Sequence, residues 1–584
     1  MEMKNRIREL ENRLANYEYM EHYSLTEIPD DESFGFENDF DKNQEERHDD
    51  GLKFSEPVCS QQLFLESGSS DLIILKLSEV HGKDISPNNT SPNSLEIREQ
   101  QKVHIPNELL RKLPTDFVFK MIEETHFYLT SIYLPFELEE LIAKIQECCS
   151  EGYLQLSKLS NNSLRPLILV LLGLGQHYTG IKPKADIDID AKEDTTCLPF
   201  FMSGICEIFP IKDINDVELV VVFIVCSYYF RAVNEDRNAI LYSNFGIVLS
   251  LQLALHSGSS YNGLSEVECE KRCRIWWSAF SSNRFLCVKL GHPLILNLSQ
   301  ITAPYPKMLS TWDGKCTKST FPNSDDLKHY IELSKISEEI TNNIYLKRSS
   351  DNGRETNLKS FMEPIFTIIQ RLVNWNKTLT ANLRLNLHER KQGDGKEKRL
   401  KYSVHLNCCY LIHLSTVPVL YQLVLEQITC NQNGEKWSIK DLSQDLMTVL
   451  TVCFNAAVLT FNILSICYEE TTLAIHGVLD PDYLYSASLT FAMGMILEPN
   501  EEFCTNFQSC LKILKHLTSQ GNPNAKAKLL KIESFISSID GSALKSYSNA
   551  STEFELGSES MKCDKNDIDM VIEPCMLELK AFFK

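Results

Sequence analysis

Long apolar stretches with a helical repeat constrain the fold of this chain more than any other feature. They run from Phe119 to Ile132, from Val217 to Phe230, from Ala239 to His256 and from Ser403 to Leu425. Short runs that alternate apolar and polar residues between tight turns, which would indicate strands, are scarce. The sequence therefore predicts an all-α fold, with one large helical domain over residues 116–540.

One apolar stretch, Leu446 to Tyr468, is long enough and free enough of charge to cross a membrane. Asn455 and Asn462 interrupt it, however, and its flanks are acidic where a basic anchor would be expected. We expect a buried core helix here and no membrane association.

Charge and cysteine spacing exclude several classes of protein. The 584 residues contain 58 Lys and Arg against 79 Asp and Glu, a net charge of −21, which excludes a chain drawn onto nucleic acid by its overall charge. The 19 cysteines form no CxxC pair, so neither a zinc ribbon nor a disulfide scaffold is indicated. The charged N-terminus does not resemble a secretory signal, and we expect an intracellular protein.

The first twenty residues carry apolar side chains at the 4-3-4-3 spacing of a coiled-coil seam. Two heptads are too short to be stable alone, so the seam needs a partner, either a second copy of the chain or its own globular body. We assign residues 1–20 to a dimerisation helix, with a frayed amphipathic end as the alternative. The residues expected to pair two chains are Ile7, Leu10, Leu14 and Tyr17.

Residues 21–115 and 541–584 are predicted to be a mostly disordered acidic linker and an acidic tail. The run from Glu27 to Asp50 combines high negative charge with Phe34, Phe36 and Phe40. This composition is typical of a segment that docks its aromatic side chains on a transcriptional coactivator. A solvating linker has the same composition, so both interpretations stay open.

The glycine-containing stretch from Leu167 to Gly180 is the best candidate for an enzyme site. Its Gly173 and Gly175 begin a dinucleotide-binding pattern, but Tyr178 occupies the third glycine position and no strand-helix alternation follows. Sequence motifs of hydrolases, zinc proteases, P-loops and EF-hands are absent from the sequence. We therefore predict no catalytic, cofactor-binding or metal-binding residue and no enzyme, and keep an unrecognised enzyme as the weakest hypothesis.

Three smaller features are interpreted structurally. Cys269 and Cys273 stand one helical turn apart, but no second pair of ligands lies near them in the sequence, so we expect packing and no metal site. His256 is expected to end a helix and cap its last carbonyls. The basic run from Arg390 to Lys401 is interpreted as an exposed loop, with a nuclear localisation signal as the alternative.

The stretch from Glu268 to Pro306 carries the most information. A helix from about Ser265 to Leu290 would place Trp276 and Trp277 on two adjacent faces, after a basic turn whose cations can pair with acidic neighbours or stack on the rings. Gly291 and Pro293 follow in the order that ends a helix.

This stretch resembles the signature of the fungal zinc-cluster transcription factors, in the helical domain called the fungal-specific or xylanolytic-activator-like regulatory domain. A preceding segment, Tyr242 to His256, resembles the helix before that signature, so the signature spans residues 239–306 within a likeness over roughly residues 117–540. Asn283 stands where the family usually has Asp, and His292 where it has Arg. The matching residues are Tyr242, His256, Glu270, Arg272, Arg274, Trp276, Trp277, Phe280, Arg284, Gly291, Pro293 and Pro304.

The resemblance implies a nuclear regulator of transcription by RNA polymerase II that binds DNA as a homodimer through a six-cysteine cluster holding two zinc ions. The chain contains no such cluster. Residues 10–14 resemble the coiled coil that follows this cluster in the family. We therefore expect the sequence to begin where the DNA-binding cluster would end. Zinc is expected only if a cluster lies upstream. Further expected partners are coactivators and a small-molecule effector. The alternative is a helical adaptor or metabolite-sensing regulator of the same family that does not bind DNA.

Overall fold

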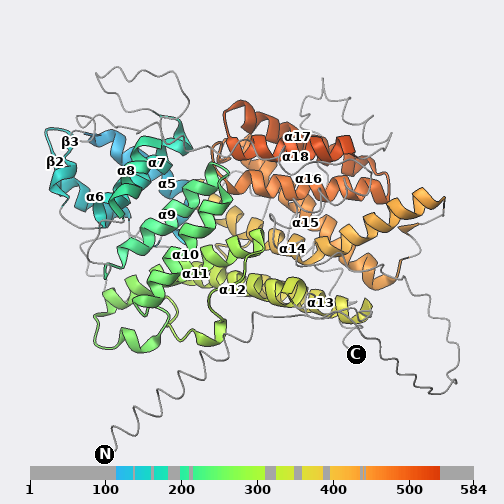
Figure 1. The fold of residues 1–584 in the computed structure, drawn as a ribbon, viewed down its shortest axis with the longest axis horizontal. Coiled ribbons are helices and arrows are strands. Elements are labelled where there is room, and N and C mark those ends of the chain that lie inside the picture. Colours follow the sequence, from blue (N-terminus) through green and yellow to red (C-terminus); the bar gives the residue numbers. More distant parts are fainter. Residues whose placement is uncertain are drawn as a thin grey trace, which may run out of the picture. The chain divides into compact units, whose positions relative to one another are not determined.

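The computed structural model describes residues 113–133, 135, 138–159, 163–181, 198–208, 215–309, 324–346, 358–385, 395–434, 438–439 and 442–538. This part of the chain contains fourteen α-helices and almost no strand, which confirms the predicted all-α class (Figure 1). The predicted coiled-coil helix, acidic linker up to residue 112 and C-terminal tail lie outside the described residues. The helices are α5 (Thr115–Tyr133), α6 (Leu138–Glu147), α7 (Leu164–Thr179), α8 (Leu198–Ile208), α9 (Glu218–Ala232), α10 (Asp236–Gln252), α11 (Glu266–Leu290), α12 (Ser324–Ile340), α13 (Leu358–Thr378), α14 (Gly395–Asn433), α15 (Gln444–Glu469), α16 (Leu479–Leu497), α17 (Glu501–Ser519) and α18 (Pro523–Ser538).

A small three-stranded antiparallel sheet was not expected from the sequence. Its strands are β1 (Leu113–Pro114), β2 (Cys149–Ser150) and β3 (Tyr153–Leu154), in the order β1-β3-β2. Glu151 and Gly152 join β2 to β3, and both have positive φ, as a tight two-residue hairpin turn requires. The strands are only two residues long, too short to display the alternation by which strands are recognised in a sequence.

The glycine-containing stretch is the interior of helix α7 and not a nucleotide-binding loop. A Cβ atom on Gly173 would lie 2.8 Å from Cβ of Phe201 in α8, and one on Gly175 would overlap the carbonyl oxygen of Met121 in α5. Gly180 ends the helix in the left-handed conformation, with φ of 65°. These glycines let α5 and α8 approach α7 closely, which is a packing role.

Replacing Gly175 with alanine should therefore destabilise the protein by about 1–3 kcal/mol, because the added methyl group meets backbone that cannot move aside freely. Gly246 provides the matched control. It also lies inside a helix, α10, but a Cβ atom there would be 3.5 Å from its nearest neighbour, an ordinary contact. Gly246→Ala should be neutral or slightly stabilising. Urea unfolding measures both variants, and equal midpoints would show that the α5–α7 crossing tolerates a side chain.

The most apolar helices form the core of the C-terminal half. By length and composition, Lys398–Asn433 and Gln444–Glu469 could each cross a membrane, but 83% and 89% of their apolar windows are buried inside the protein. Helix α15 packs against both α14 and α16. The prediction of a buried core helix at residues 446–468 is confirmed.

The part of the basic run that the structure describes is not an exposed loop. Residues 395–401 form the first turns of α14, and Arg399 is fully buried against Asp480 of α16. Its Nη1 and Nη2 atoms donate to Oδ2 and Oδ1 of Asp480 at 3.1 and 2.7 Å. The loop prediction is therefore wrong for these residues, because one arginine of the run is recruited by a buried carboxylate that the sequence places 81 residues away.

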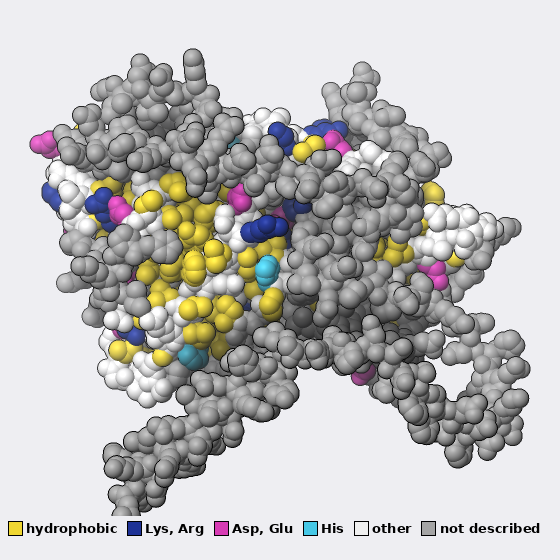
Figure 2. All heavy atoms as spheres, in the orientation of Figure 1, with side chains coloured by type: hydrophobic (Ala, Val, Ile, Leu, Met, Phe, Trp, Pro, Cys, Tyr) yellow, Lys and Arg dark blue, Asp and Glu magenta, His cyan; other side chains and the backbone are white. Residues whose placement is uncertain are grey.

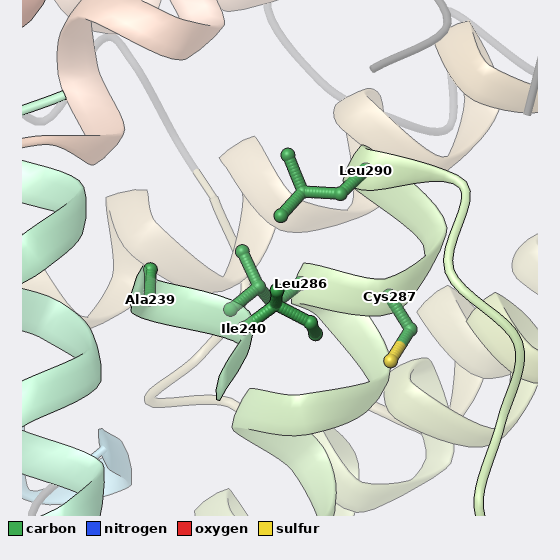
Figure 3. Close-up of a cluster of buried hydrophobic side chains, with 5 residues drawn as sticks. All are labelled: Ala239, Ile240, Leu286, Cys287 and Leu290. Atoms are coloured by element: carbon green, nitrogen blue, oxygen red, sulfur yellow. The ribbon is translucent and has the colours of Figure 1, made fainter. Parts of the chain in front are cut away.

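Helix α10 uses apolar residues on several faces. Ala239 and Ile240 pack against Leu286, Cys287 and Leu290 of α11 (Figure 3). Its opposite side reaches the surface, where Figure 2 shows hydrophobic side chains gathered over α9 and α10. Two large apolar side chains of α10, Leu241 and Val248, are exposed and lie two turns apart. Some of the apolar residues of α10 therefore lie at the surface and not in the core.

Candidate functional site

The signature helix α11 begins and ends where the sequence predicted. The Ser265 hydroxyl accepts a hydrogen bond from the backbone N–H of Glu268 at 3.3 Å, an N-cap. Gly291 ends the helix with φ of 67°, and its N–H donates to the carbonyl oxygen of Cys287. Between these caps, almost every side chain from Cys273 to Leu290 is buried, so α11 is a central helix of this part of the fold.

The paired tryptophans hold the segment that follows α11. Trp276 and Trp277 are buried, and Nε1 of Trp277 donates to the carbonyl oxygen of Pro304 at 2.8 Å. The Trp277 ring stacks on Tyr305, with ring centres 5.3 Å apart and planes within 13°. Phe280 meets Trp277 edge to face at 5.3 Å. Pro304, the last of the matching residues, therefore lies beside Trp277 because the chain folds back along α11.

The basic turn at the start of α11 pairs with acidic residues, as predicted. Lys271 Nζ lies 2.7 Å from Glu218 Oε1 of α9, and Arg272 Nε lies 2.7 Å from Glu268 Oε1 one turn earlier. Burial alone would raise the pKa of Glu218, but Lys271 and Lys144 outweigh it and lower the pKa.

Arg274 and Glu270 form a second pair that is buried. The free carboxylate oxygen of Glu270 accepts from the backbone N–H of Lys307 at 2.9 Å, and Arg274 Nη2 donates to the Lys307 carbonyl oxygen at 3.5 Å. This pair thus fixes the chain beyond Pro304 to α11. Two of the predicted signature residues thus act together on a backbone segment.

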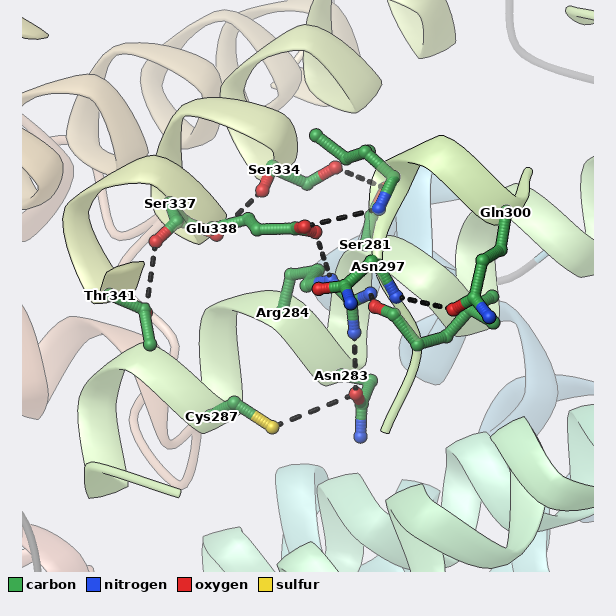
Figure 4. Close-up of polar contacts among 12 residues, drawn as sticks. Ser281, Asn283, Arg284, Cys287, Asn297, Gln300, Ser334, Ser337, Glu338 and Thr341 are labelled. Atoms are coloured by element: carbon green, nitrogen blue, oxygen red, sulfur yellow. Dashed lines mark hydrogen bonds and ion pairs between the residues drawn. The ribbon is translucent and has the colours of Figure 1, made fainter. Parts of the chain in front are cut away.

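A deeply buried ion pair joins α11 to α12 (Figure 4). Arg284 Nε donates to Glu338 Oε2 at 2.8 Å, and the exposed fractions of the two side chains are 0% and 4%. Glu338 Oε1 also accepts from the backbone N–H of Leu298 at 3.2 Å, and Arg284 Nη2 donates to the carbonyl oxygen of Leu296. The pair therefore fixes both α12 and the loop after α11, and sequence reasoning missed Glu338 because nothing marks a carboxylate 54 residues away as its partner.

Asn283, where the family usually has Asp, bridges α11 to α10. Its Nδ2 donates to Ser243 Oγ at 3.0 Å and to Asn244 Oδ1 at 2.9 Å, while its Oδ1 accepts from Arg284 Nη1 at 3.4 Å. The neutral amide can donate to α10, which a carboxylate could not do. Arg284 thus forms its ion pair with α12, and Asn283 forms hydrogen bonds with α10.

The remaining signature residues lie at the edges of this network. Tyr242 is buried against Phe230 of α9 at a ring distance of 4.9 Å. The prediction that His256 caps a helix is wrong, because α10 ends at Gln252, four residues earlier. The His256 carbonyl oxygen accepts from the N–H groups of Thr302 and Ala303, both at 2.9 Å. It therefore anchors the returning loop, while Pro293 follows the helix end and is exposed.

A second buried charge cluster, which the sequence did not predict, surrounds Asp482 of α16. Lys289 of α11 lies 2.7 Å from Asp482 Oδ2, Arg231 of α9 lies 3.4 Å from the same oxygen, and Lys528 of α18 lies 3.7 Å from Oδ1. Burial alone would raise the pKa of Asp482, but the charges of Lys289, Lys528 and Arg231 lower it to about 2. The cluster joins four helices that are distant in the sequence.

Two cysteines of α11 are buried in this region. Burial raises the pKa of Cys287 to about 12 and that of Cys273 still further, so both thiols stay protonated. Cys273 Sγ donates to the carbonyl oxygen of Pro304 at 2.9 Å. In the part of the chain that the structure describes, no three His, Cys, Asp or Glu side chains group closely enough to hold a metal ion.

Comparison with known proteins gives matches among fungal transcription regulators. A family model described as the fungal specific transcription factor domain matches residues 127–384. The chain is 22% identical over 330 residues to the thiamine repressible genes regulatory protein thi1 of Schizosaccharomyces pombe, covering 56% of this chain and 40% of the relative. It is 22% identical over 314 residues to an uncharacterized transcriptional regulatory protein of the same organism, covering 53% and 36%.

A shorter match, 29% identical over 128 residues, is to the TY1 enhancer activator of Saccharomyces cerevisiae and covers 20% of this chain and 17% of the relative. The alignments thus span well under half the length of these curated relatives. No solved structure matches the chain. The family match contains α11, its signature residues and Glu338, and it ends before α14.

Proposed function

The chain belongs to the fungal specific transcription factor domain family through residues 127–384, and from this premise we propose that it regulates transcription by RNA polymerase II in the nucleus. The observation that supports this most is the agreement between the family match and the α11 network. The signature residues Arg274, Trp277 and Arg284 all lie on α11, and each donates a hydrogen bond to the segment that follows α11 or to α12. The relatives' names, which describe transcription regulators, agree with the proposal.

The proposal is tested by tethering the full chain to a bacterial DNA-binding domain upstream of a reporter gene. We expect reporter transcription to differ from that of the DNA-binding domain alone. Equal transcription at equal protein level would contradict a regulatory role for the chain.

We further propose that the acidic segment from Glu27 to Asp50 contacts coactivators through its aromatic side chains. In the tethered reporter, replacing Phe34, Phe36 and Phe40 with alanine should return transcription toward that of the DNA-binding domain alone while leaving the charge unchanged. Asp39→Asn with Asp41→Asn is the control that lowers the charge and keeps the aromatic residues. If the segment is only a solvating linker, the phenylalanine variant will behave as the wild type.

We propose that the chain is a homodimer through the seam at Ile7, Leu10, Leu14 and Tyr17. Sedimentation equilibrium should give twice the chain mass of 66.9 kDa. Ile7→Asp with Leu14→Asp should give the monomer mass. Arg8→Asp with Ala15→Asp introduces aspartates one residue off the seam and should keep the dimer. A monomeric wild type, or a dimer that survives the seam variant, would exclude this interface.

DNA binding by the natural gene product is proposed to use a six-cysteine zinc cluster N-terminal to the seam. The second candidate is a helical adaptor or metabolite-sensing regulator of the same family that does not contact DNA. The protein expressed from its native gene and then purified distinguishes the zinc-cluster proposal from the adaptor. Site-specific DNA binding that a zinc chelator abolishes supports the zinc-cluster proposal, and protein that ignores DNA at low salt supports the adaptor.

A further inference from the structure

Helix α18 presents an apolar side chain to solvent that its packing does not use. The helix buries Leu529, Ile532 and Phe535, which are 9%, 1% and 0% exposed. Leu530 lies on the other side of the helix and is 51% exposed. Its side chain is therefore available for contact with another protein.

Two charged residues accompany Leu530 on this surface. Glu533 is exposed and comes three residues later, so it lies one helical turn away on the same outer face of α18. Its carboxylate forms no ion pair among the residues that the structure describes. Lys531 is half-buried at the edge of this face, and its four-carbon chain lets the amino group reach solvent.

The order of these residues is a recognition pattern for a lysine modification. The enzyme that conjugates the small ubiquitin-like modifier recognises a lysine that follows a large apolar residue and precedes an acidic residue by two positions. Residues 530–533, Leu-Lys-Ile-Glu, match this pattern, and among the described lysines only Lys531 has such neighbours. Residues 561–564, Met-Lys-Cys-Asp, match it as well but lie outside the described residues.

We propose that Lys531 is an attachment site for the small ubiquitin-like modifier, with Leu530 and Glu533 as the residues that the conjugating enzyme contacts. The modifier arrives as a thioester between its C-terminal glycine and a cysteine of that enzyme. The deprotonated Nζ of Lys531 attacks the thioester carbonyl carbon, so that an isopeptide C–N bond forms as the C–S bond breaks. The proton released by the amine passes to the leaving thiolate.

Helix α17 contains a matched control lysine. Residues 511–514 are Leu-Lys-Ile-Leu, so Lys512 has the same immediate neighbours as Lys531 but lacks the acidic residue. Its preceding leucine, Leu511, is only 9% exposed. Lys512 is itself exposed, whereas Lys531 is half-buried. Unselective reaction with accessible amines would therefore favour Lys512, and recognition of the pattern would favour Lys531.

The test incubates the purified full chain with the modifier, its activating and conjugating enzymes and ATP. All samples carry Lys562→Arg, which removes the match in the tail. We expect one conjugate, which mass spectrometry of tryptic peptides places on Lys531. Lys531→Arg should abolish it, and Lys512→Arg should leave its yield unchanged. Glu533→Gln should slow conjugation by about tenfold, the loss expected for a hydrogen bond to a charged group.

The substitutions at Lys531 and Glu533 keep the shape of half-buried or exposed side chains, and equal melting temperatures verify that the variants fold. Absence of any conjugate, or a conjugate that persists in Lys531→Arg, would overturn the proposal. Conjugation of Glu533→Gln at the unchanged rate would exclude recognition through the acidic residue. The reaction uses purified components, so its outcome is independent of the proposed role in transcription.

Discussion

Replacing Arg284 with methionine should lower the free energy of unfolding by about 3–5 kcal/mol, the range measured when one partner of a buried ion pair is removed. The variant leaves the Glu338 carboxylate, 4% exposed, without its only side-chain cation among the described residues. It also removes the donor to the Leu296 carbonyl oxygen. Urea unfolding followed by circular dichroism measures the loss.

Two further variants show whether the ion pair is the cause. Arg284→Met with Glu338→Met removes both charges and should recover much of the stability, because no buried charge is left unpaired. Arg272→Met breaks the partly exposed pair with Glu268 in the same helix and should cost only about 0–1 kcal/mol. If the double variant is no more stable than Arg284→Met alone, the pairing account of this network is wrong.

The Asp482→Asn variant should show a loss of similar size, about 3–5 kcal/mol. It removes the buried carboxylate that Lys289 approaches to 2.7 Å and that Arg231 and Lys528 also face. Asp325→Asn is the matched control, because its pair with Lys328 is largely exposed and should contribute almost nothing. Equal unfolding midpoints for the two variants would mean that the Asp482 cluster does not stabilise the fold.

The same cluster predicts a pH dependence of stability. Because the folded pKa of Asp482 is lowered to about 2, below the usual value of about 3.9 for Asp, its contribution is fully present above the usual value. That contribution is lost as the pH falls through about 2. The stability difference between the wild type and Asp482→Asn should therefore shrink with pH below about 4. A difference that stays constant to pH 2 would contradict the lowered pKa.

The course of helix α11 could be predicted from the sequence because its signals are local. Ser265 and Gly291 fix its ends through caps that involve residues one turn away, and the tryptophans identify its buried face. The pairing of the basic turn was also predictable in kind, since Glu268 and Glu270 lie four residues before Arg272 and Arg274.

The partners of Arg284 and Lys289 could not be predicted, because their distance along the chain is set by the tertiary fold. Glu338 lies 54 residues from Arg284, and Asp482 lies 193 residues from Lys289. The wrong prediction for Arg399 has the same cause. A basic residue next to a polar loop is predicted to be exposed, because its buried partner Asp480 lies far away in the sequence. The end of the helix was wrongly predicted at His256 because the apolar residues continue for one turn beyond Gln252, where α10 ends.

Promoter occupancy of the endogenous tagged protein, measured together with transcripts after its rapid depletion, tests the central claim most directly. We predict occupancy at a defined set of promoters and changed transcription of the genes that they control. Occupancy no higher than in an untagged strain, with unchanged transcripts after depletion, would contradict the proposal that this chain regulates transcription.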